Sequence, residues 1–171
     1  MADQLNIGVV GCLGRMGQAI VAAINEAEGA RFVAGSEVAV HPGVGKRLRG
    51  TDVIVGDSAK AVFEAADVVI DFTPPGNTST HTLLACETGT PLVVGTTGFT
   101  EDDDAAMTHA GNHTVMVQAG NYSLGVNLLM SLVKDAASKL GAEWDIEVLE
   151  LHHRHKVDAP SGTALMLGEA A

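Results

Sequence analysis

Short, strongly apolar runs alternate with segments of helical spacing over most of the chain. Five of the apolar runs predict buried strands, at residues 5–10, 31–35, 67–73, 91–94 and 113–117. Between these runs, helical spacing or a capping residue predicts helices after Gly17, over 58–65, over 78–87 and after Thr100. This alternation predicts an α/β fold with a Rossmann-like, doubly wound and mostly parallel sheet that carries helices on both faces.

The pattern changes after residue 121. Residues 124–140 form a long amphipathic segment whose apolar face predicts a packed helix, and residues 144–151 form another strand-like run. A further helix is predicted to begin at Ser161, which is a good N-cap. We therefore expect two domains, residues 1–121 and residues 122–171. The second would be a linking helix followed by the beginning of an α+β domain.

Composition and charge exclude several classes of partner. The 171 residues are 46% hydrophobic with a net charge of −11, which argues against non-specific binding to nucleic acid or to anionic membranes. No apolar stretch approaches the roughly 20 residues of a membrane span, and the N-terminus lacks the pattern of a signal peptide. Cys12 and Cys86 have no metal-binding spacing and fit a reducing compartment. We expect a cytoplasmic protein.

A glycine-rich turn follows the first predicted strand. Gly11, Gly14 and Gly17 have the spacing G-x-x-G-x-x-G, with a strand before them and a helix after them. Glu37 lies 20 residues past Gly17 at the end of the second strand, where an acid can bind the hydroxyls of an adenosine ribose. These features predict a dinucleotide site at the carboxyl ends of the strands. The alternative is that Glu37 is a solvated loop acid.

Residues 152–156 form a basic, imidazole-rich stretch, His-His-Arg-His-Lys, in an otherwise acidic chain. Backbone N–H groups at the helix start after Ser161 bind anions, so we predict a site for a small dianion with a proton donor beside it. A solvated cluster of charges and a metal site remain as alternatives. The metal site is the weaker one, because strand alternation separates His152 from His153 and His155, and the neighbouring cations repel a metal.

Two other charged segments have simpler interpretations. Asp102, Asp103 and Asp104 follow the candidate N-cap Thr100, where the helix dipole favours negative charge, so we interpret them as capping charges and not as metal ligands. Residues 41–50 form a loop with three cations. This loop is either a solvated connector or a source of positive charge for a cofactor 2′-phosphate.

Five segments together resemble the 4-hydroxy-tetrahydrodipicolinate reductases, also called dihydrodipicolinate reductases, of diaminopimelate and lysine biosynthesis. The segments are the glycine turn, Asp71-Phe72-Thr73, Gly95-Thr96-Thr97-Gly98-Phe99, Gly120-Asn121-Tyr122-Ser123 and the stretch from His152 to Thr163. The resemblance runs from about Ile7 to the last residue, and the last of these segments is far more specific than the glycine turn. It implies reduction of 4-hydroxy-tetrahydrodipicolinate to tetrahydrodipicolinate by NADH or NADPH, with loss of water and without a metal.

The resemblance also implies a role for each matching residue. The cofactor pyrophosphate would lie against Gly11, Cys12, Leu13, Gly14, Arg15 and Met16, and the adenosine ribose against Glu37. The nicotinamide end would be lined by Gly95, Thr96, Thr97, Ala119, Gly120, Asn121 and Tyr122. His152 would donate or accept the proton, and Lys156 would help to protonate or polarise the substrate. The carboxylates of a small dicarboxylate substrate would be bound by His153, Lys156, Ser161, Gly162 and Thr163.

The chain departs from the family pattern in two respects. Many members carry Arg after the acidic residue and use it on the NADPH 2′-phosphate, whereas this chain has Val38, which favours NADH unless the cations of residues 46–49 compensate. Members also continue well past the position of Ala171, into strands that complete the substrate domain and the contacts of a homotetramer. We therefore expect a C-terminally truncated reductase whose tetramer is in doubt. The alternatives are a dinucleotide-binding fragment without turnover, or another two-domain dehydrogenase acting on an amino-acid-derived substrate.

Overall fold

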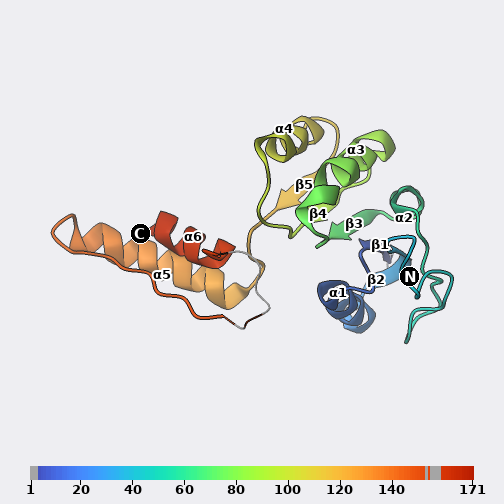
Figure 1. Cartoon of the computed structure of the whole chain (residues 1–171), viewed down its shortest axis with the longest axis horizontal. Coiled ribbons are helices and arrows are strands. Elements are labelled where there is room, and N and C mark those ends of the chain that lie inside the picture. Colours follow the sequence, from blue (N-terminus) through green and yellow to red (C-terminus); the bar gives the residue numbers. More distant parts are fainter. Residues whose placement is uncertain (1–3, 153, 155–158) are drawn as a thin grey trace. The chain divides into compact units, whose positions relative to one another are not determined.

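The computed structural model describes residues 4–152, 154 and 159–171. Contacts between residues divide the chain into two compact units, Met1–Gln118 and Ala119–Ala171. The first unit is a sheet with its helices, and the second consists of two helices and the segment that joins them (Figure 1).

One parallel sheet organises the first unit. Its strands are β1 (Leu5–Val10), β2 (Ala30–Ser36), β3 (Val68–Asp71), β4 (Leu92–Val94) and β5 (Met116–Gln118), in the spatial order β2-β1-β3-β4-β5. The register pairs Val10 with both Ser36 and Asp71, and Val94 with both Asp71 and Gln118. The carboxyl ends of all five strands are therefore level at one edge of the sheet. The predicted Rossmann-like α/β fold is confirmed.

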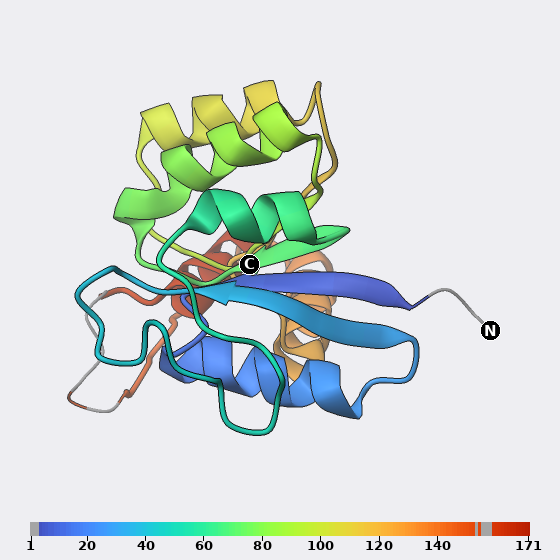
Figure 2. The ribbon, with the colours of Figure 1, turned by 90° about the vertical axis from the view of Figure 1, so that its right-hand side faces the viewer.

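The helices of the first unit cover both faces of this sheet (Figure 2). Helix α1 (Arg15–Glu26) lies on one face, and α2 (Ala59–Ala65), α3 (Thr78–Thr88) and α4 (Glu101–Ala110) lie on the other, with a short 3₁₀ turn, η1 (Pro75–Asn77), before α3. Strand alternation divides the core accordingly. Ile7 and Val9 pack in the cluster with α1, whereas Val10 packs with Val62 and Phe63 of α2.

Local capping signals place the helix starts where the sequence predicts them. The Ser58 hydroxyl accepts the N–H of Ala61, and Thr100 forms a capping box with Asp103 in which each side chain accepts a backbone N–H of the other residue. The acids after Thr100 are thus first-turn charges, as predicted. Strands β3, β4 and β5 are shorter than predicted. Residues 72–73 leave the sheet after β3, and residues 113–114 close the turn after α4.

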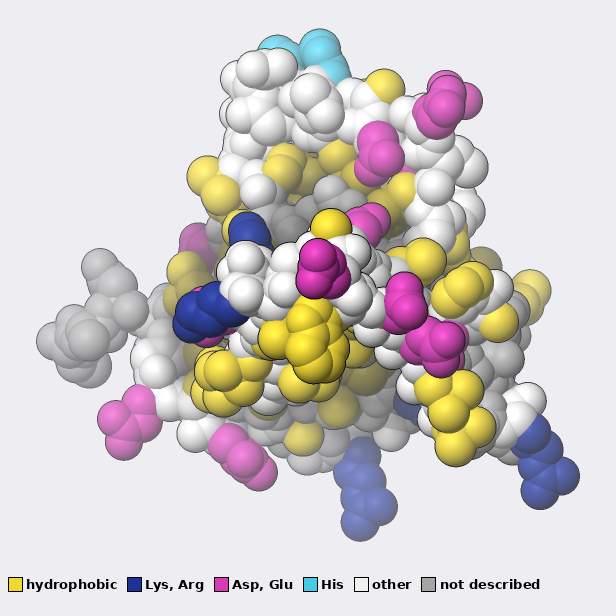
Figure 3. Space-filling view, turned by 90° about the vertical axis from the view of Figure 1, so that its left-hand side faces the viewer, with side chains coloured by type: hydrophobic (Ala, Val, Ile, Leu, Met, Phe, Trp, Pro, Cys, Tyr) yellow, Lys and Arg dark blue, Asp and Glu magenta, His cyan; other side chains and the backbone are white. Residues whose placement is uncertain are grey.

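The second unit contains α5 (Leu124–Leu140) and α6 (Gly162–Ala170), which pack on each other. The predicted strand over residues 144–151 is wrong, since none of the described residues of this unit forms a strand. A strand needs a neighbour for its backbone hydrogen bonds, and this segment has none among them. The apolar face of α5 is also less packed than expected, because Leu124 is 86% and Leu132 is 58% exposed. Figure 3 shows hydrophobic side chains over much of the face that it draws, with acidic and basic side chains between them.

Candidate functional site

The glycine turn connects β1 to α1 in a conformation that depends on its glycines. Gly11 has φ +68°, and its N–H and that of Cys12 both donate to the Ser36 carbonyl, at 2.9 and 3.2 Å. A side chain on Gly11 would also meet Thr73, whose Cγ2 lies 2.8 Å from the position of an added Cβ. The turn is thus fixed against the ends of both neighbouring strands, β2 and β3.

Gly17 allows α1 to lie directly on this turn. A Cβ at Gly17 would be 2.1 Å from the Gly11 carbonyl oxygen and 2.7 Å from the Cys12 Cα. Both contacts are with backbone, which cannot rotate away. The third glycine therefore serves the close helix–turn packing that the sequence motif predicts.

No side-chain hydrogen bond caps the start of helix α1. Its N-cap is Gly14, which makes no capping hydrogen bond, and no acid occupies the first turn. Helices α2, α4, α5 and α6 each begin with a Ser or Thr cap, whereas α3 begins, like α1, without a side-chain cap. The positive end of the α1 dipole is therefore available to an anionic group.

Glu37 is attached to the turn and is not a loop acid without partners. Its carboxylate accepts the N–H of Leu13 at 3.2 Å through one oxygen and the N–H of Val38 at 3.1 Å through the other. The same carboxylate contributes to the raised pKa of the Cys12 thiol, which burial, the larger cause, and Glu37 together bring from 9.0 to about 11. Cys12 is thus a packing residue of the turn, with an unreactive thiol.

A cavity of about 270 Å³ lies between the glycine turn and the ends of β2 and β3. It is lined by Val10, Gly11, Gly14, Ser36, Glu37, Val38, Asp57, Ala59, Phe72, Thr73, Pro74, Asn77 and His81. The lining combines small residues and backbone near α1 with two carboxylates, Glu37 and Asp57. This arrangement suits a ligand with hydroxyl groups at the acidic end and a phosphate at the α1 end.

The sequence analysis missed a buried Asp–His pair at this cavity. His81 of α3 lies with its Nδ1 2.7 Å from Oδ2 of Asp71, which is fully buried at the end of β3. The other Asp71 oxygen accepts the Thr73 N–H at 2.7 Å. Burial raises the pKa of Asp71, but the hydrogen bond and charge of His81 and the bonds from Thr73 together hold it below its ordinary value. A carboxylate at a strand end with a histidine ten residues later was the available signal.

The end of β4 packs against the same segment. An added Cβ on Gly95 would lie 2.0 Å from the Phe72 ring, and the Thr96 hydroxyl donates to the Thr73 carbonyl at 2.7 Å. Residues 72–73 therefore contact both the glycine turn and the β4 end. The structure thus brings together the predicted residues of the first unit, from Gly11 to Thr97, along one edge of the sheet.

The predicted substrate residues that the structure describes belong to the second unit. Ser161 is 2% exposed and caps α6, accepting the N–H of Ala164 at 3.0 Å. Glu150, which the sequence analysis did not single out, accepts the Ser161 N–H at 2.7 Å and lies 3.3 Å from Nδ1 of His152. His153 and Lys156 lie outside the described residues. Ala119, Gly120, Asn121 and Tyr122 also belong to this unit, before α5.

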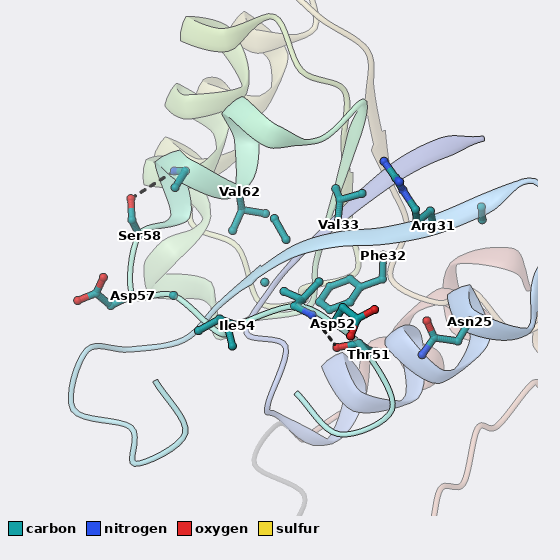
Figure 4. Close-up of a pocket in the computed structure, with 16 residues that line it drawn as sticks. Asn25, Arg31, Phe32, Val33, Thr51, Asp52, Ile54, Asp57, Ser58 and Val62 are labelled. Atoms are coloured by element: carbon teal, nitrogen blue, oxygen red, sulfur yellow. Dashed lines mark hydrogen bonds between the residues drawn. The ribbon is translucent and has the colours of Figure 1, made fainter. Parts of the chain in front are cut away.

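A larger hollow, of about 960 Å³, lies beside the edge strand β2. Figure 4 shows Asp57 and Ser58 at one end of it and Asn25 and Arg31 at the other. The Arg31 guanidinium is already bonded to the Asn6 side chain, at 2.8 and 3.2 Å. The hollow follows the length of the strand instead of its carboxyl end. Its size alone does not make it the ligand site. The glycine turn and the carboxylate of Glu37, which suit a dinucleotide, line the smaller cavity.

Comparisons with known proteins decide the family. The model "Dihydrodipicolinate reductase, N-terminus" matches residues 5–122, and "Dihydrodipicolinate reductase, C-terminus" matches residues 125–171.

The chain belongs to the dihydrodipicolinate reductase family.

Curated members of the family resemble the chain over its whole length. The 4-hydroxy-tetrahydrodipicolinate reductase 1 of Mesorhizobium japonicum is 47% identical over 99% of this chain, and that of Ruegeria sp. is 45% identical over 100%. The chain spans only 65% and 66% of the lengths of these two relatives.

Solved structures share the fold of this chain. A dipicolinate-bound dihydrodipicolinate reductase from Paenisporosarcina sp. TG-14 matches with a TM-score of 0.76 at 27% identity, covering 98% of this chain and 65% of that one. A myo-inositol 2-dehydrogenase from Lactobacillus plantarum matches with a TM-score of 0.62 at 17% identity, over 78% of this chain and 42% of that one. The second match shows a shared fold alone.

The described residues contain no group of three or more His, Cys, Asp or Glu placed to hold a metal ion. Within the same residues, no helix has both the length and the apolar character needed to cross a bilayer.

Proposed function

We propose that the chain carries out, as part of a dihydrodipicolinate reductase, the NADH- or NADPH-dependent reduction of 4-hydroxy-tetrahydrodipicolinate to tetrahydrodipicolinate with loss of water. The observation that carries the proposal is the glycine turn. It presents the uncapped start of α1 to a cavity and attaches Glu37 to the same turn. Membership of the family supplies the substrate class, a small dicarboxylate.

In this proposal, residues 1–121 bind the dinucleotide. The N–H groups of the first α1 turn receive the pyrophosphate, and the Glu37 carboxylate accepts hydrogen bonds from the ribose hydroxyls. The glycine turn fits such a group because it carries no side chains at Gly11 or Gly17. A side chain on Gly11 would meet Thr73, and one on Gly17 would displace the turn. When bound, the nicotinamide supplies the hydride. Gly95, Thr96 and Thr97 at the β4 end would line its ring together with Ala119, Gly120, Asn121 and Tyr122.

Residues 122–171 supply the substrate side of the proposed site. His152 holds the proton that is transferred, and Lys156 polarises the substrate. The N–H groups at the start of α6, with His153 and the Thr163 hydroxyl, bind carboxylates. Ser161 orders this helix start through its cap.

The acidic end of the cavity favours NADH over NADPH. Glu37 and Asp57 both line it, and Val38 stands where a cation would be needed for a 2′-phosphate. One of the three cations of the 41–50 loop, Arg47, forms an ion pair with Asp52. A negatively charged 2′-phosphate would therefore meet two carboxylates, which costs binding free energy. We also propose a cytoplasmic location, consistent with the free thiols of Cys12 and Cys86.

Titration calorimetry of the 171-residue chain with NADH and NADPH, with and without pyridine-2,6-dicarboxylate, tests the proposal. We expect NADH to bind more tightly than NADPH, and the dicarboxylate to strengthen NADH binding. Gly14→Val should abolish binding while circular dichroism shows the fold intact. Absence of NADH binding by the folded parent chain would overturn the dinucleotide assignment.

The second candidate function is dinucleotide binding without turnover. It is favoured by one specific observation: every residue that lines the cavity at the glycine turn belongs to the first unit. NADH binding with no response to the dicarboxylate, and no oxidation of NADH with substrate, would select it. If turnover is present, His152→Gln should lower kcat by about 10²–10⁴-fold, as expected for a general acid–base group. The exposed His109 of α4 offers the matched control, His109→Gln, which should leave kcat unchanged.

A further inference from the structure

Glu150 connects two parts of the second unit that the sequence separates. One carboxylate oxygen accepts the backbone N–H of Ser161 at 2.7 Å, across eleven residues. The other oxygen lies 3.3 Å from Nδ1 of His152, a distance within ion-pair range but long for a neutral hydrogen bond. The side chain of Glu150 thus contacts both His152 and Ser161, the N-cap residue of α6.

The carboxylate of Glu150 lies in partly buried, largely apolar surroundings. Its side chain is 27% exposed and lines an open hollow of about 830 Å³ with the apolar residues Val148, Leu149, Pro160 and Leu165. The other acid of this hollow is Glu169, at the end of α6. A half-buried carboxylate among apolar groups is stabilised by the hydrogen bonds it accepts, so its orientation is set by them.

We propose that Glu150 is a positioning residue for His152: it holds the imidazole in the form protonated at Nδ1 and fixes it relative to the start of α6. A carboxylate next to Nδ1 favours the proton on that nitrogen and leaves Nε2 as the nitrogen that exchanges a proton with a ligand. The same carboxylate sets the position of Ser161, whose helix start binds the substrate in the proposed function. The inference therefore rests on that function for its catalytic meaning, but its geometry does not depend on it.

The competing explanation is purely structural. Glu150 would then only complete the cap of α6 by accepting the Ser161 N–H, and its distance from His152 would have no consequence. The two explanations differ in what happens to the His152 ring when the carboxylate is replaced by an amide. Glu150→Gln retains an oxygen for the Ser161 N–H but removes the charge and one acceptor beside Nδ1.

The test is ¹⁵N NMR of the full 171-residue chain labelled at histidine, at pH about 9, where an ordinary imidazole is neutral. Coupling between ring nitrogens and carbon-bound protons reports which nitrogen carries the proton, and His152→Gln assigns the signal. We expect the Nδ1–H form in the parent chain and its loss in Glu150→Gln. The matched control is Glu147→Gln, an exposed acid of the same segment, which should change nothing. An Nε2–H form in the parent chain, or an unchanged ring in Glu150→Gln, would overturn the proposal.

Ser161→Ala separates positioning from helix stability. It removes the hydroxyl that accepts the Ala164 N–H and weakens the α6 start, but leaves the Ser161 backbone N–H for Glu150. We expect the Nδ1–H form of His152 to persist. If it disappears in this variant as well, the ring follows the stability of α6 and Glu150 does not position it.

If the chain turns over, kinetics measure how the loss of the Glu150 carboxylate affects catalysis. Glu150→Gln should lower kcat by part of the ~10²–10⁴-fold that a general acid–base group contributes, while NADH affinity stays unchanged. An unchanged kcat would refute the positioning role even if the ring changes its protonated nitrogen. A chain that neither binds NADH nor turns over would contradict the proposed function alone, because the NMR result requires neither.

Discussion

Replacing Gly17 by Ala is a direct test of the glycine turn as the proposed dinucleotide site. In an ordinary helix interior this substitution stabilises, because Ala is favoured over Gly by about 1 kcal/mol. At Gly17 the new Cβ would lie 2.1 Å from the Gly11 carbonyl oxygen, about 1.3 Å inside an ordinary 3.4 Å contact, and 2.7 Å from the Cys12 Cα. Overpacking typically costs about 1–3 kcal/mol, and a contact with backbone leaves only displacement of the turn as relief. We expect a net loss of up to about 2 kcal/mol in the free energy of unfolding, in place of the gain of about 1 kcal/mol.

Urea unfolding measures this loss, and thiol labelling locates it. Cys12 is fully buried with a pKa raised to about 11, so it should resist a thiol reagent at pH 8 in the parent chain. Displacement of the turn in Gly17→Ala should speed Cys12 labelling, with Cys86 distinguished by peptide mass. NADH affinity should fall in the same variant, since the moved turn no longer presents the start of α1.

Gly168→Ala is the matched control in the interior of another helix, α6. An added Cβ at Gly168 meets nothing within 4 Å, so this variant should gain about 0.5–1 kcal/mol. The sign of the effect therefore distinguishes packing from helix propensity. A Gly17→Ala chain that gains stability like Gly168→Ala, or that binds NADH as tightly as the parent, would refute the role of close helix–turn packing.

Three further predictions address the same unit. His81→Leu should cost about 3–5 kcal/mol at pH 7, because it leaves the carboxylate of Asp71 buried without its partner. In the variant, burial without His81 raises the pKa of Asp71, whereas in the parent His81 helps to hold this pKa below the ordinary 3.8. The difference between parent and variant in urea titrations should therefore shrink as the pH falls through the variant's raised pKa toward that of the parent. A constant difference down to pH about 2 would contradict the pair. Glu37→Gln should raise the ratio of NADPH to NADH affinity in calorimetry, and an unchanged ratio would remove Glu37 from ribose selection. Thr100→Ala should lose about 0.5–2 kcal/mol in urea unfolding through the capping box with Asp103, and no loss would mean that the Asp103–Ser79 hydrogen bond holds α4 alone.

The features that the sequence predicted are those encoded by neighbouring residues. The glycine turn, the Ser58 and Thr100 caps and the helix start at Ser161 each depend on residues within a few positions, so their signals are local. The level carboxyl ends of the strands follow from parallel pairing, which the alternation of strands and helices implies. These rules were sufficient to place Gly11, Glu37 and Gly95 along one edge of the sheet.

The features that the sequence analysis missed join residues that lie farther apart. Asp71 and His81 are ten residues apart on a strand and a helix, and Glu150 and Ser161 are eleven apart. Neither spacing belongs to a repeating secondary-structure pattern, so no periodicity signals the contact. What does signal it is chemistry: a carboxylate at the end of an apolar strand must find a donor on folding, and a nearby histidine or helix start is a suitable one.

The incorrect prediction of a strand over residues 144–151 shows what a hydrophobic pattern alone cannot predict. Trp144, Ile146 and Val148 alternate with polar residues, and this alternation is what a half-buried strand requires. In the structure the three side chains are 46–62% exposed, and none of the described residues of their unit pairs with this backbone. A helix makes its hydrogen bonds within one segment, so α5 forms over its predicted residues although its apolar face is exposed. A strand makes its backbone hydrogen bonds with a neighbouring strand. An alternating pattern therefore predicts that a segment can pair, but not that a partner is present.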